Sequence, residues 1–189
     1  MRQAKTLQQR EIKTVLAVIN TRRYAARDRA IFALSFFAGL RAQEIATLTF
    51  ENVLGTDGTV GSEFLLLPAQ TKGKRTRRIF VSDRLRKELE LYVKSQPKST
   101  LQNQPLFVTQ KGNAFTANAI CHLFKAIYVQ CGIVGASSHS GRRTFITELA
   151  TKGVSVRVLA ALAGHATIST TQRYIDINDR QLRAAVELV

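Results

Sequence analysis

The sequence has few of the residues that build disulfide frameworks and metal centres, with two cysteines and three histidines among 189 residues. Cys121 and Cys131 fall in what reads as one helix, about 280° apart around its axis at 3.6 residues per turn, so they cannot easily form a disulfide. We therefore expect free thiols in a reducing compartment. His122 lies beside Cys121, but this pair supplies too few ligands for a metal, and a helix-surface position is the simpler interpretation.

Long apolar segments are also missing. The chain has no apolar run near 18 residues, no signal peptide and no long basic amphipathic helix. It also has no internal repeat and no low-complexity segment. We therefore expect a cytoplasmic protein that does not bind membranes.

Acidic residues are few, because 13 Asp and Glu stand against 28 Lys and Arg and leave a formal net charge of +15. Such an excess of positive charge indicates which partners the protein binds and does not indicate its fold. Nucleic acid is the leading partner, and an anionic membrane is the competing one, which the missing apolar and basic amphipathic segments disfavour. The hydrophobic content of 45% is enough for the core of a single compact domain.

The spacing of apolar residues in the first half of the chain predicts helices followed by a small sheet. From Lys13 to Phe37 they recur at helical spacing in two helices, Gly39 is expected to end the second, and a new helix begins around Ala42. Two short strands, Phe64–Pro68 and Arg77–Val81, are joined by a polar, glycine-containing hairpin connection.

The second half of the chain reads as helical. Ser82 is expected to cap a helix whose apolar stripe contains Leu85, Leu89 and Tyr92, and the most loop-like stretch runs from Ser95 to Pro105. Further helices are expected after Thr116 and from about Ser140, Ser155, Ser169 and Asn178. The predicted fold class is mainly α with a small antiparallel β-sheet (α+β).

His139 and Arg142 stand three residues apart in HSGRR, a spacing that brings two side chains to one face of a helix. Here they fall in its first turn, where backbone N–H groups and the helix dipole favour an anion. The motif is weak when taken alone, because ordinary helix surfaces produce it often, and Arg143 beside it reads equally well as a solvated charge.

A second polar cluster is GLRAQE, in which Arg41 precedes Glu44 by three residues. The carboxylate can hold the guanidinium in a fixed orientation through charge-assisted hydrogen bonds, and an arginine held in this way can bind two phosphate oxygens. The alternative is an ordinary ion pair on a helix surface.

The predicted hairpin is rich in cations. A flexible ammonium at its tip, on Lys72 or Lys74, could reach into a DNA groove and give a proton to a departing oxygen, whereas the alternative is a solvated loop. The density of positive charge favours phosphate contact. The cations are Lys72, Lys74, Arg75, Arg77 and Arg78.

The last cluster is LAGHATISTTQRY, in which Tyr174 follows His165 by nine residues. Gly164 is expected to end an apolar helix so that His165 projects just beyond it, and a threonine-rich step, Thr167 to Thr171, then leads into a helix that carries Tyr174. A tyrosine hydroxyl has a pKa of about 10, so a chain that uses one as a nucleophile needs cations and proton carriers around the target.

In order along the chain, GLRAQEIATL, TKGKRTRRIFV, HSGRRTFITELATKG and LAGHATISTTQRY strongly resemble the tyrosine recombinase (phage integrase) family. The resemblance covers essentially the whole chain and implies the catalytic-domain fold of that family, in a protein that belongs to a mobile genetic element. It also implies a catalytic set. The set is Arg41, Lys72, His139, Arg142, His165 and Tyr174, with Glu44 in support of Arg41.

The resemblance implies that Tyr174 attacks the scissile phosphate and leaves a 3′-phosphotyrosine and a free 5′-hydroxyl. Because the bond energy is kept, neither ATP nor metal is needed, which agrees with the lack of a GxxxxGK[ST] loop or a carboxylate cluster in the sequence. Arg41 and Arg142 would neutralise charge on the non-bridging oxygens. DNA contacts are expected from Lys74, Arg75, Arg77, Arg78 and Arg143.

The proton carriers follow from the same resemblance. Lys72 would protonate the leaving 5′-oxygen, with Lys74 as the alternative because it lies only two residues further on. His139 would act as hydrogen-bond partner or base toward the nucleophile. His165 would donate to a phosphate oxygen.

The resemblance further implies one catalytic domain over residues 1–189, without the core-binding domain that usually precedes it in the family. We expect a homo-oligomer of up to four copies on DNA, joined through Asn178–Val189, although this segment could equally pack on its own domain. The expected location is the nucleoid of a bacterium or the host of a phage. The rival interpretations are a type IB topoisomerase and a non-catalytic DNA-binding or regulatory protein that retains the fold.

Overall fold

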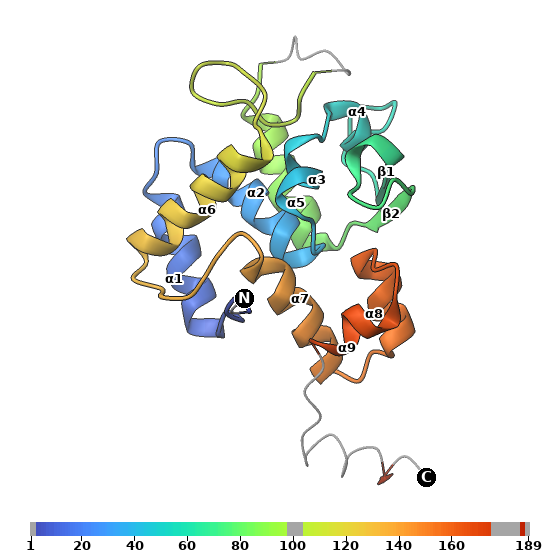
Figure 1. The fold of residues 1–189 in the computed structure, drawn as a ribbon. Helices are drawn as coiled ribbons and strands as arrows, with labels where there is room; N and C mark the ends of the chain where they lie inside the picture. The colour runs from blue at the N-terminus through green and yellow to red at the C-terminus, as the bar shows by residue number, and fades with distance from the viewer. Residues whose placement is uncertain (1–2, 98–103, 175–185, 188–189) are drawn as a thin grey trace.

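The computed structural model describes residues 3–97, 104–174 and 186–187. Within these residues the chain is mostly helical with one two-stranded antiparallel sheet, which confirms the predicted fold class (Figure 1). The first elements are α1 (Gln9–Asn20), α2 (Ala25–Phe37), α3 (Ala42–Ala46), α4 (Phe50–Val53), β1 (Glu63–Leu66), η1 (Pro68–Gln70) and β2 (Arg77–Phe80). The later ones are α5 (Asp83–Lys94), α6 (Ala117–Gln130), α7 (Ser140–Thr151), α8 (Val156–Ala163) and α9 (Ile168–Gln172).

Helix α2 is the central element of the fold. It contacts α1, α3, α5 and α7, and its middle, from Ala30 to Ser35, is buried on every side. A helix that is apolar nearly all round belongs inside a domain rather than at its surface. One hydrophobic cluster surrounds it and draws its members from α1 to α6 and the sheet.

The amphipathic helices cover this core as their stripes predict. Ser82 accepts a hydrogen bond from the Leu85 N–H at 3.4 Å, and Leu85, Leu89 and Tyr92 are buried, as expected for a capped helix with one apolar face. Thr116 caps α6 in the same way. Both cysteines are free thiols, as predicted.

Helices α7 to α9 form a separate layer. The buried Ile146 of α7 and Leu159 of α8 lie outside the main hydrophobic cluster. Helix α7 packs on α2, where a Cβ at Gly141 would lie 2.6 Å from the Ser35 hydroxyl oxygen, so the close approach requires glycine. In Figure 1 this layer, coloured orange to red, lies beside the sheet and beneath α2 and α5.

The threonine-rich segment differs from its prediction. The helix predicted from about Ser169 is present as α9, which begins at Ile168, but it forms from the threonine-rich segment itself and does not carry Tyr174. Helix α9 ends at Gln172, and Tyr174 lies in a turn closed by its N–H donating to the Thr171 carbonyl at 2.9 Å. The helix expected from Asn178, and most of the proposed docking segment, lie outside the described residues.

No helix in the described ranges combines the length and the apolar content that a bilayer span requires.

Candidate active site

The site begins at the first turn of α7, where Arg142 is only 4% exposed. Its Nη1 donates to the Gly39 carbonyl, between α2 and α3, and its Nη2 donates to the Ala163 carbonyl, at the end of α8. One guanidinium therefore joins three segments that are far apart in the sequence. Its burial and the nearby charges of Arg41 and Arg77 lower the pKa of Arg142 to about 9, so it still carries its charge at neutral pH.

Glu44 is the anion of this region and is 1% exposed. The contact with Arg41 that the RxxE spacing predicted is present, since Glu44 accepts the Arg41 N–H and the Arg41 Nη1, both at 2.8 Å. Glu44 also accepts a hydrogen bond from Arg77 Nη1 at 2.8 Å. A carboxylate that accepts several charged donors in this way fixes their orientation.

Arg77 lies inside the protein, which corrects its expected place among the DNA-contacting cations. Its side chain is buried, and besides Glu44 it donates to the carbonyls of Ala38 (3.3 Å) and Leu162 (2.5 Å). Strand alternation explains the difference, because Arg77 shares the inward face of β2 with Ile79 while Arg78 points outward. Burial lowers the pKa of Arg77, and the Glu44 carboxylate opposes that shift.

The other cations of this segment are exposed. Lys72, Lys74 and Arg75 lie on the connection between η1 and β2, and Arg78 is 60% exposed with a loose contact to Glu63 at 3.6 Å. Within the described part of the chain, neither lysine ammonium has a hydrogen-bond or ion-pair partner. Lys72 is close enough to His139 for its charge to act on that imidazole.

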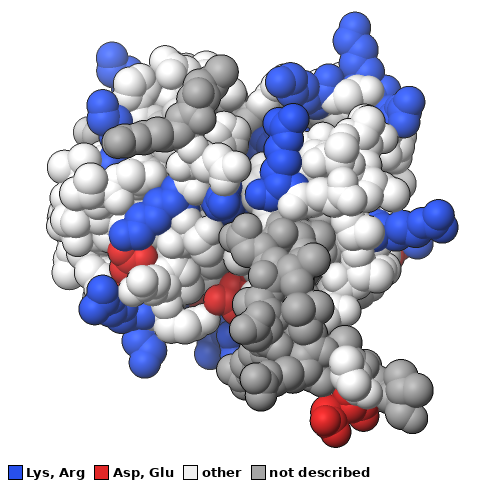
Figure 2. Space-filling model, turned by 60° about the horizontal axis from the view of Figure 1, so that its bottom comes forward, with Lys and Arg blue, Asp and Glu red and all other residues white. Residues whose placement is uncertain are grey.

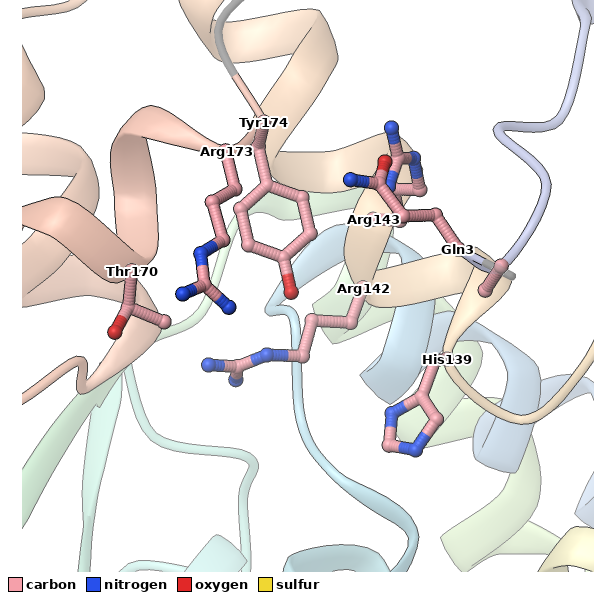
Figure 3. A pocket seen from close by; sticks show the side chains of 8 residues that line it. Gln3, His139, Arg142, Arg143, Thr170, Arg173 and Tyr174 are labelled. Carbon is pink, nitrogen blue, oxygen red and sulfur yellow. The ribbon is translucent and has the colours of Figure 1, made fainter. Parts of the chain in front are cut away.

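Tyr174 lines a pocket of about 300 Å³ at the start of α7. In Figure 3 its phenol points into this pocket toward the Arg142 side chain, with Arg173 beside it and His139 beyond Arg142. The Arg143 guanidinium lies 5.5 Å from the centre of the tyrosine ring, and Arg143 Nε also donates to the Thr6 hydroxyl at 3.1 Å. The sequence had not singled out Arg173, although its place beside Tyr174 is a signal that could have found it.

His165 enters the site from the end of α8. Gly164 has a left-handed conformation (φ +62°), as predicted for the residue that ends this helix, and the His165 N–H returns to the Ala160 carbonyl at 2.9 Å. A Cβ at Gly164 would lie 2.6 Å from Arg77 Cδ, so only glycine fits against that buried side chain. The His165 ring stacks on Tyr174, with 5.7 Å between the ring centres.

The surroundings of both histidines of the site favour the neutral imidazole. Desolvation and the charges of Arg142, Arg41 and Arg77 lower the pKa of His165 to about 4. Desolvation, followed by the charges of Arg142, Arg41 and Lys72, lowers the pKa of His139 below its ordinary value. A neutral imidazole can accept a proton, which a permanently charged arginine cannot do.

A second hollow, of about 550 Å³, lies between the β2 connection and α8, and Arg41 and His165 line it from one side. Arg75 and Arg78 add positive charge to its wall, and Phe80 adds an apolar surface. Figure 2 shows one face of the molecule, over which Lys and Arg are spread with few acidic residues between them. This face suits an extended polyanion.

The structure brings Arg41, His139, Arg142, His165 and Tyr174 together, and it leaves Lys72 on an exposed segment near them. A phenol beside buried guanidinium groups and neutral imidazoles is an arrangement suited to attack on a phosphodiester. Among the described residues, no group of three or more His, Cys, Asp and Glu could hold a metal ion.

Comparison with known proteins places these features in context. The model described as "Phage integrase family" matches residues 5–181. The chain is 31% identical over 187 residues to the tyrosine recombinase XerA of Pyrococcus horikoshii, an alignment that covers 97% of this chain and 60% of that protein. The chain thus spans about 60% of the length of the curated relative.

Solved structures show the same fold. The Tn1549 transposon integrase in complex with circular intermediate DNA aligns with a TM-score of 0.76 at 19% identity, over 99% of this chain and 67% of that chain. The catalytic domain of bacteriophage HP1 integrase aligns with a TM-score of 0.68 at 23% identity, over 98% and 95% of the two chains.

Proposed function

This chain belongs to the phage integrase family, and from this premise we propose that it cleaves and rejoins DNA strands at specific sites. The observation that carries the proposal is the position of Tyr174, whose phenol points into a pocket toward the buried cation Arg142. A phosphate bound in this pocket meets a nucleophile and a fixed positive charge together. The proposed chemistry is transfer of a DNA strand end to the phenolic oxygen, without ATP or metal.

In this proposal the Tyr174 oxygen attacks the phosphorus, the bond to the 5′-oxygen breaks, and a 3′-phosphotyrosine forms. Arg41 and Arg142 stabilise the negative charge on the non-bridging oxygens, and they require no reorganisation because Glu44 and backbone carbonyls already hold them. His139, whose surroundings lower its pKa and so favour the neutral imidazole, is the base or hydrogen-bond partner of the phenol. His165 donates to a phosphate oxygen.

We assign the protonation of the leaving 5′-oxygen to Lys72, with Lys74 as the alternative. Both ammonium groups are exposed, and the electrostatic effect of Lys72 on His139 favours Lys72 as the lysine nearer the reacting centre. A substrate with sulfur in place of the bridging 5′-oxygen separates this role from charge neutralisation, because a thiolate leaves without a proton. We expect that substrate to restore cleavage by Lys72→Ala and not by Arg41→Ala, measured as single-turnover adduct formation. Equal failure of both variants would exclude Lys72 as the acid.

The proposed partner is double-stranded DNA. The excess of 28 basic over 13 acidic residues supports it, as do the exposed Arg75 and Arg78, which line the second hollow, and the exposed Lys74 beside Arg75 on the same connection. Arg143, beside Tyr174, is proposed to contact the phosphate backbone near the cleaved bond.

We also propose that residues 1–189 form one catalytic domain that acts as a homo-oligomer of up to four copies on DNA. The likeness to the HP1 catalytic domain over nearly the full length of both chains supports the single-domain assignment. The proposed contact between copies uses Asn178–Val189, and the proposed setting is the nucleoid of a bacterium or of a phage host. A truncation after Ile177 that still assembles on DNA, measured by analytical ultracentrifugation, would contradict that contact.

The central experiment is a search for the covalent adduct. The protein is incubated with a library of duplexes in which a nick lies close to a randomised segment, so that cleavage releases a short oligonucleotide and traps the adduct. We expect SDS-resistant protein–DNA complexes whose DNA sequences converge, and a tryptic peptide with Tyr174 esterified. Tyr174→Phe should form none, whereas Tyr24→Phe, on the α1–α2 connection, should behave as wild type.

Two results would contradict the proposal. Adducts from Tyr174→Phe would show that another residue is the nucleophile. Duplex binding without adducts, cleavage or plasmid relaxation would instead favour the non-catalytic DNA-binding protein.

A further inference from the structure

Thr171 is a fully buried threonine that the proposed chemistry does not use. Its side chain is 0% exposed, and its Oγ1 lies 2.8 Å from His165 Nδ1. The two residues lie six positions apart and meet because Gly164 turns the chain back after α8. Whether the hydroxyl donates to the imidazole or accepts from it depends on which ring nitrogen carries the proton.

The destination of the hydroxyl hydrogen decides between these two arrangements. Other threonines on helices donate to the carbonyl four residues earlier, as Thr144 does at 2.8 Å and Thr151 does at 2.9 Å. Within the described ranges the Thr171 hydroxyl has no such carbonyl acceptor, and His165 Nδ1 is the one hydrogen-bond partner of this hydroxyl. A proton on Nδ1 would therefore leave the buried hydroxyl hydrogen without an acceptor, an arrangement that folded proteins avoid.

We infer that Thr171 donates its hydroxyl hydrogen to Nδ1 and so fixes His165 in the tautomer that carries its proton on Nε2. Thr171 is then a positioning residue that makes Nε2–H available as a donor. The inference rests on the proposed function in one respect, namely that the group accepting a hydrogen bond from Nε2–H is a phosphate oxygen. The position of the proton itself follows from the Thr171 contact alone.

The charge state of the ring is consistent with this inference. Desolvation, followed by the charges of Arg142, Arg41 and Arg77, keeps the pKa of His165 at about 4, while the charge of Glu44 opposes the shift in part. The imidazole is therefore neutral at pH 7 and carries one proton. With a single proton to place, the partner of Nδ1 determines which nitrogen donates.

Thr171 also holds the tyrosine. Its carbonyl accepts the Tyr174 N–H at 2.9 Å, and the Tyr174 ring stacks on the imidazole that the Thr171 hydroxyl orients. One residue thus sets the position of two groups of the site through different atoms. Replacing the side chain alone should affect His165 and leave the backbone contact to Tyr174 in place.

The test is the tautomer of His165 in the DNA-free protein, read at pH 7 from long-range ¹H–¹⁵N correlations of ¹⁵N-histidine. We expect the wild type and Thr171→Ser to show a proton on Nε2. Thr171→Val, which keeps the shape without the hydroxyl, should show both tautomers. Thr151→Val, a matched change at an exposed helix position, should leave the spectrum unchanged.

A proton on Nδ1 in the wild type would overturn the inference, as would one unchanged tautomer in a folded Thr171→Val. If Thr171→Val does not fold, the wild-type and serine spectra still decide. In the adduct assay we expect Thr171→Val to be slower by about tenfold, as for one lost hydrogen bond, and Thr171→Ser to stay near the wild-type rate. A wild type with the expected tautomer but no adduct would contradict the proposed function and leave this inference intact.

Discussion

The two parts of the molecule are held together by different interactions. From α1 to α6 and the sheet, the elements share one apolar cluster, in which side chains such as Leu34 and Leu89 are completely buried. The α7–α9 layer joins this body in part through buried arginines that donate to backbone carbonyls, Arg142 to Gly39 and Arg77 to Leu162. Apolar packing is non-directional, whereas guanidinium–carbonyl contacts fix angles as well as distances.

This difference shows where the geometry of the site originates. Arg142 reaches across the boundary between the two parts to Gly39, and Arg77, which Glu44 holds, reaches across it to Leu162, so contacts that position the proposed catalytic groups also join the layer to the body. In the apolar body, in contrast, we expect the loss of a methylene to leave the charged groups of the boundary in place. Changes at the boundary and changes in the body should therefore have separable effects on rate and on stability.

The largest expected effect is that of Arg142→Lys on the rate. Lysine keeps the charge but loses the planar fork that reaches both carbonyls, and we expect single-turnover adduct formation to fall by about 10²- to 10³-fold. The rate is measured well below the unfolding midpoint of the variant. A rate within threefold of wild type would mean that charge alone is sufficient at this position.

The contrasting change is Leu89→Ala in the apolar body. We expect the free energy of unfolding to fall by about 3 kcal/mol, because the substitution leaves a cavity at a fully buried position. The adduct rate of the folded fraction should stay near wild type. Urea denaturation and the single-turnover assay measure the two quantities, and a rate loss as large as that of Arg142→Lys would show that the two parts are not separable.

Glu44→Gln should lower both the free energy of unfolding and the rate of adduct formation. Arg41 and Arg77 lose their shared anion, and we expect the free energy of unfolding to fall by about 2–3 kcal/mol. The adduct rate should fall as well, because Arg41 is no longer held. Glu63→Gln is the matched control, since its partner Arg78 is exposed, and it should cost less than about 0.5 kcal/mol. An equal loss of unfolding free energy in the two variants would contradict the distinction between the buried ion pairs of Glu44 and the exposed ion pair of Glu63.

The smallest expected effect is on the pH dependence of stability. His165 has a pKa of about 4 when folded and about 6.5 when unfolded, so between these values only the unfolded chain binds the proton. Stability from this residue is therefore present above pH 6.5 and lost as the pH falls toward 4. We expect His165→Asn to reduce the loss of stability between pH 7 and pH 4.5, measured by urea denaturation, with His122→Asn as the control for the substitution itself. An unchanged loss would contradict the lowered pKa.

Much of the fold could be predicted from the sequence, because short-range patterns determine it. Ser82, Thr116 and Ser155 each cap the helix that their position predicted, and the left-handed Gly164 ends α8 as expected. The RxxE spacing likewise predicted the contact of Arg41 with Glu44, since both residues lie in one turn.

Long-range contacts account for the rest. The density of basic residues placed Arg77 with its exposed neighbours, although its partner Glu44 lies 33 positions away and no local signal joins them. The alternation of side chains along β2 could have predicted that Arg77 is buried, because Arg77 and the apolar Ile79 share one face of the strand. The start of α9 at Ile168 lies within one residue of the predicted Ser169, whereas its end at Gln172, before Tyr174, was not predicted.

The two carbonyl contacts of Arg142 also bear on how such a protein could change over evolutionary time. A descendant that gave up strand cleavage but still needed a stable scaffold could dispense with Tyr174, whose side chain lines an open pocket. It could not so readily dispense with Arg142, because two peptide oxygens would then lose their donor in the interior. Inactive descendants should therefore retain Arg142 more often than Tyr174, and the presence of this arginine alone does not indicate activity.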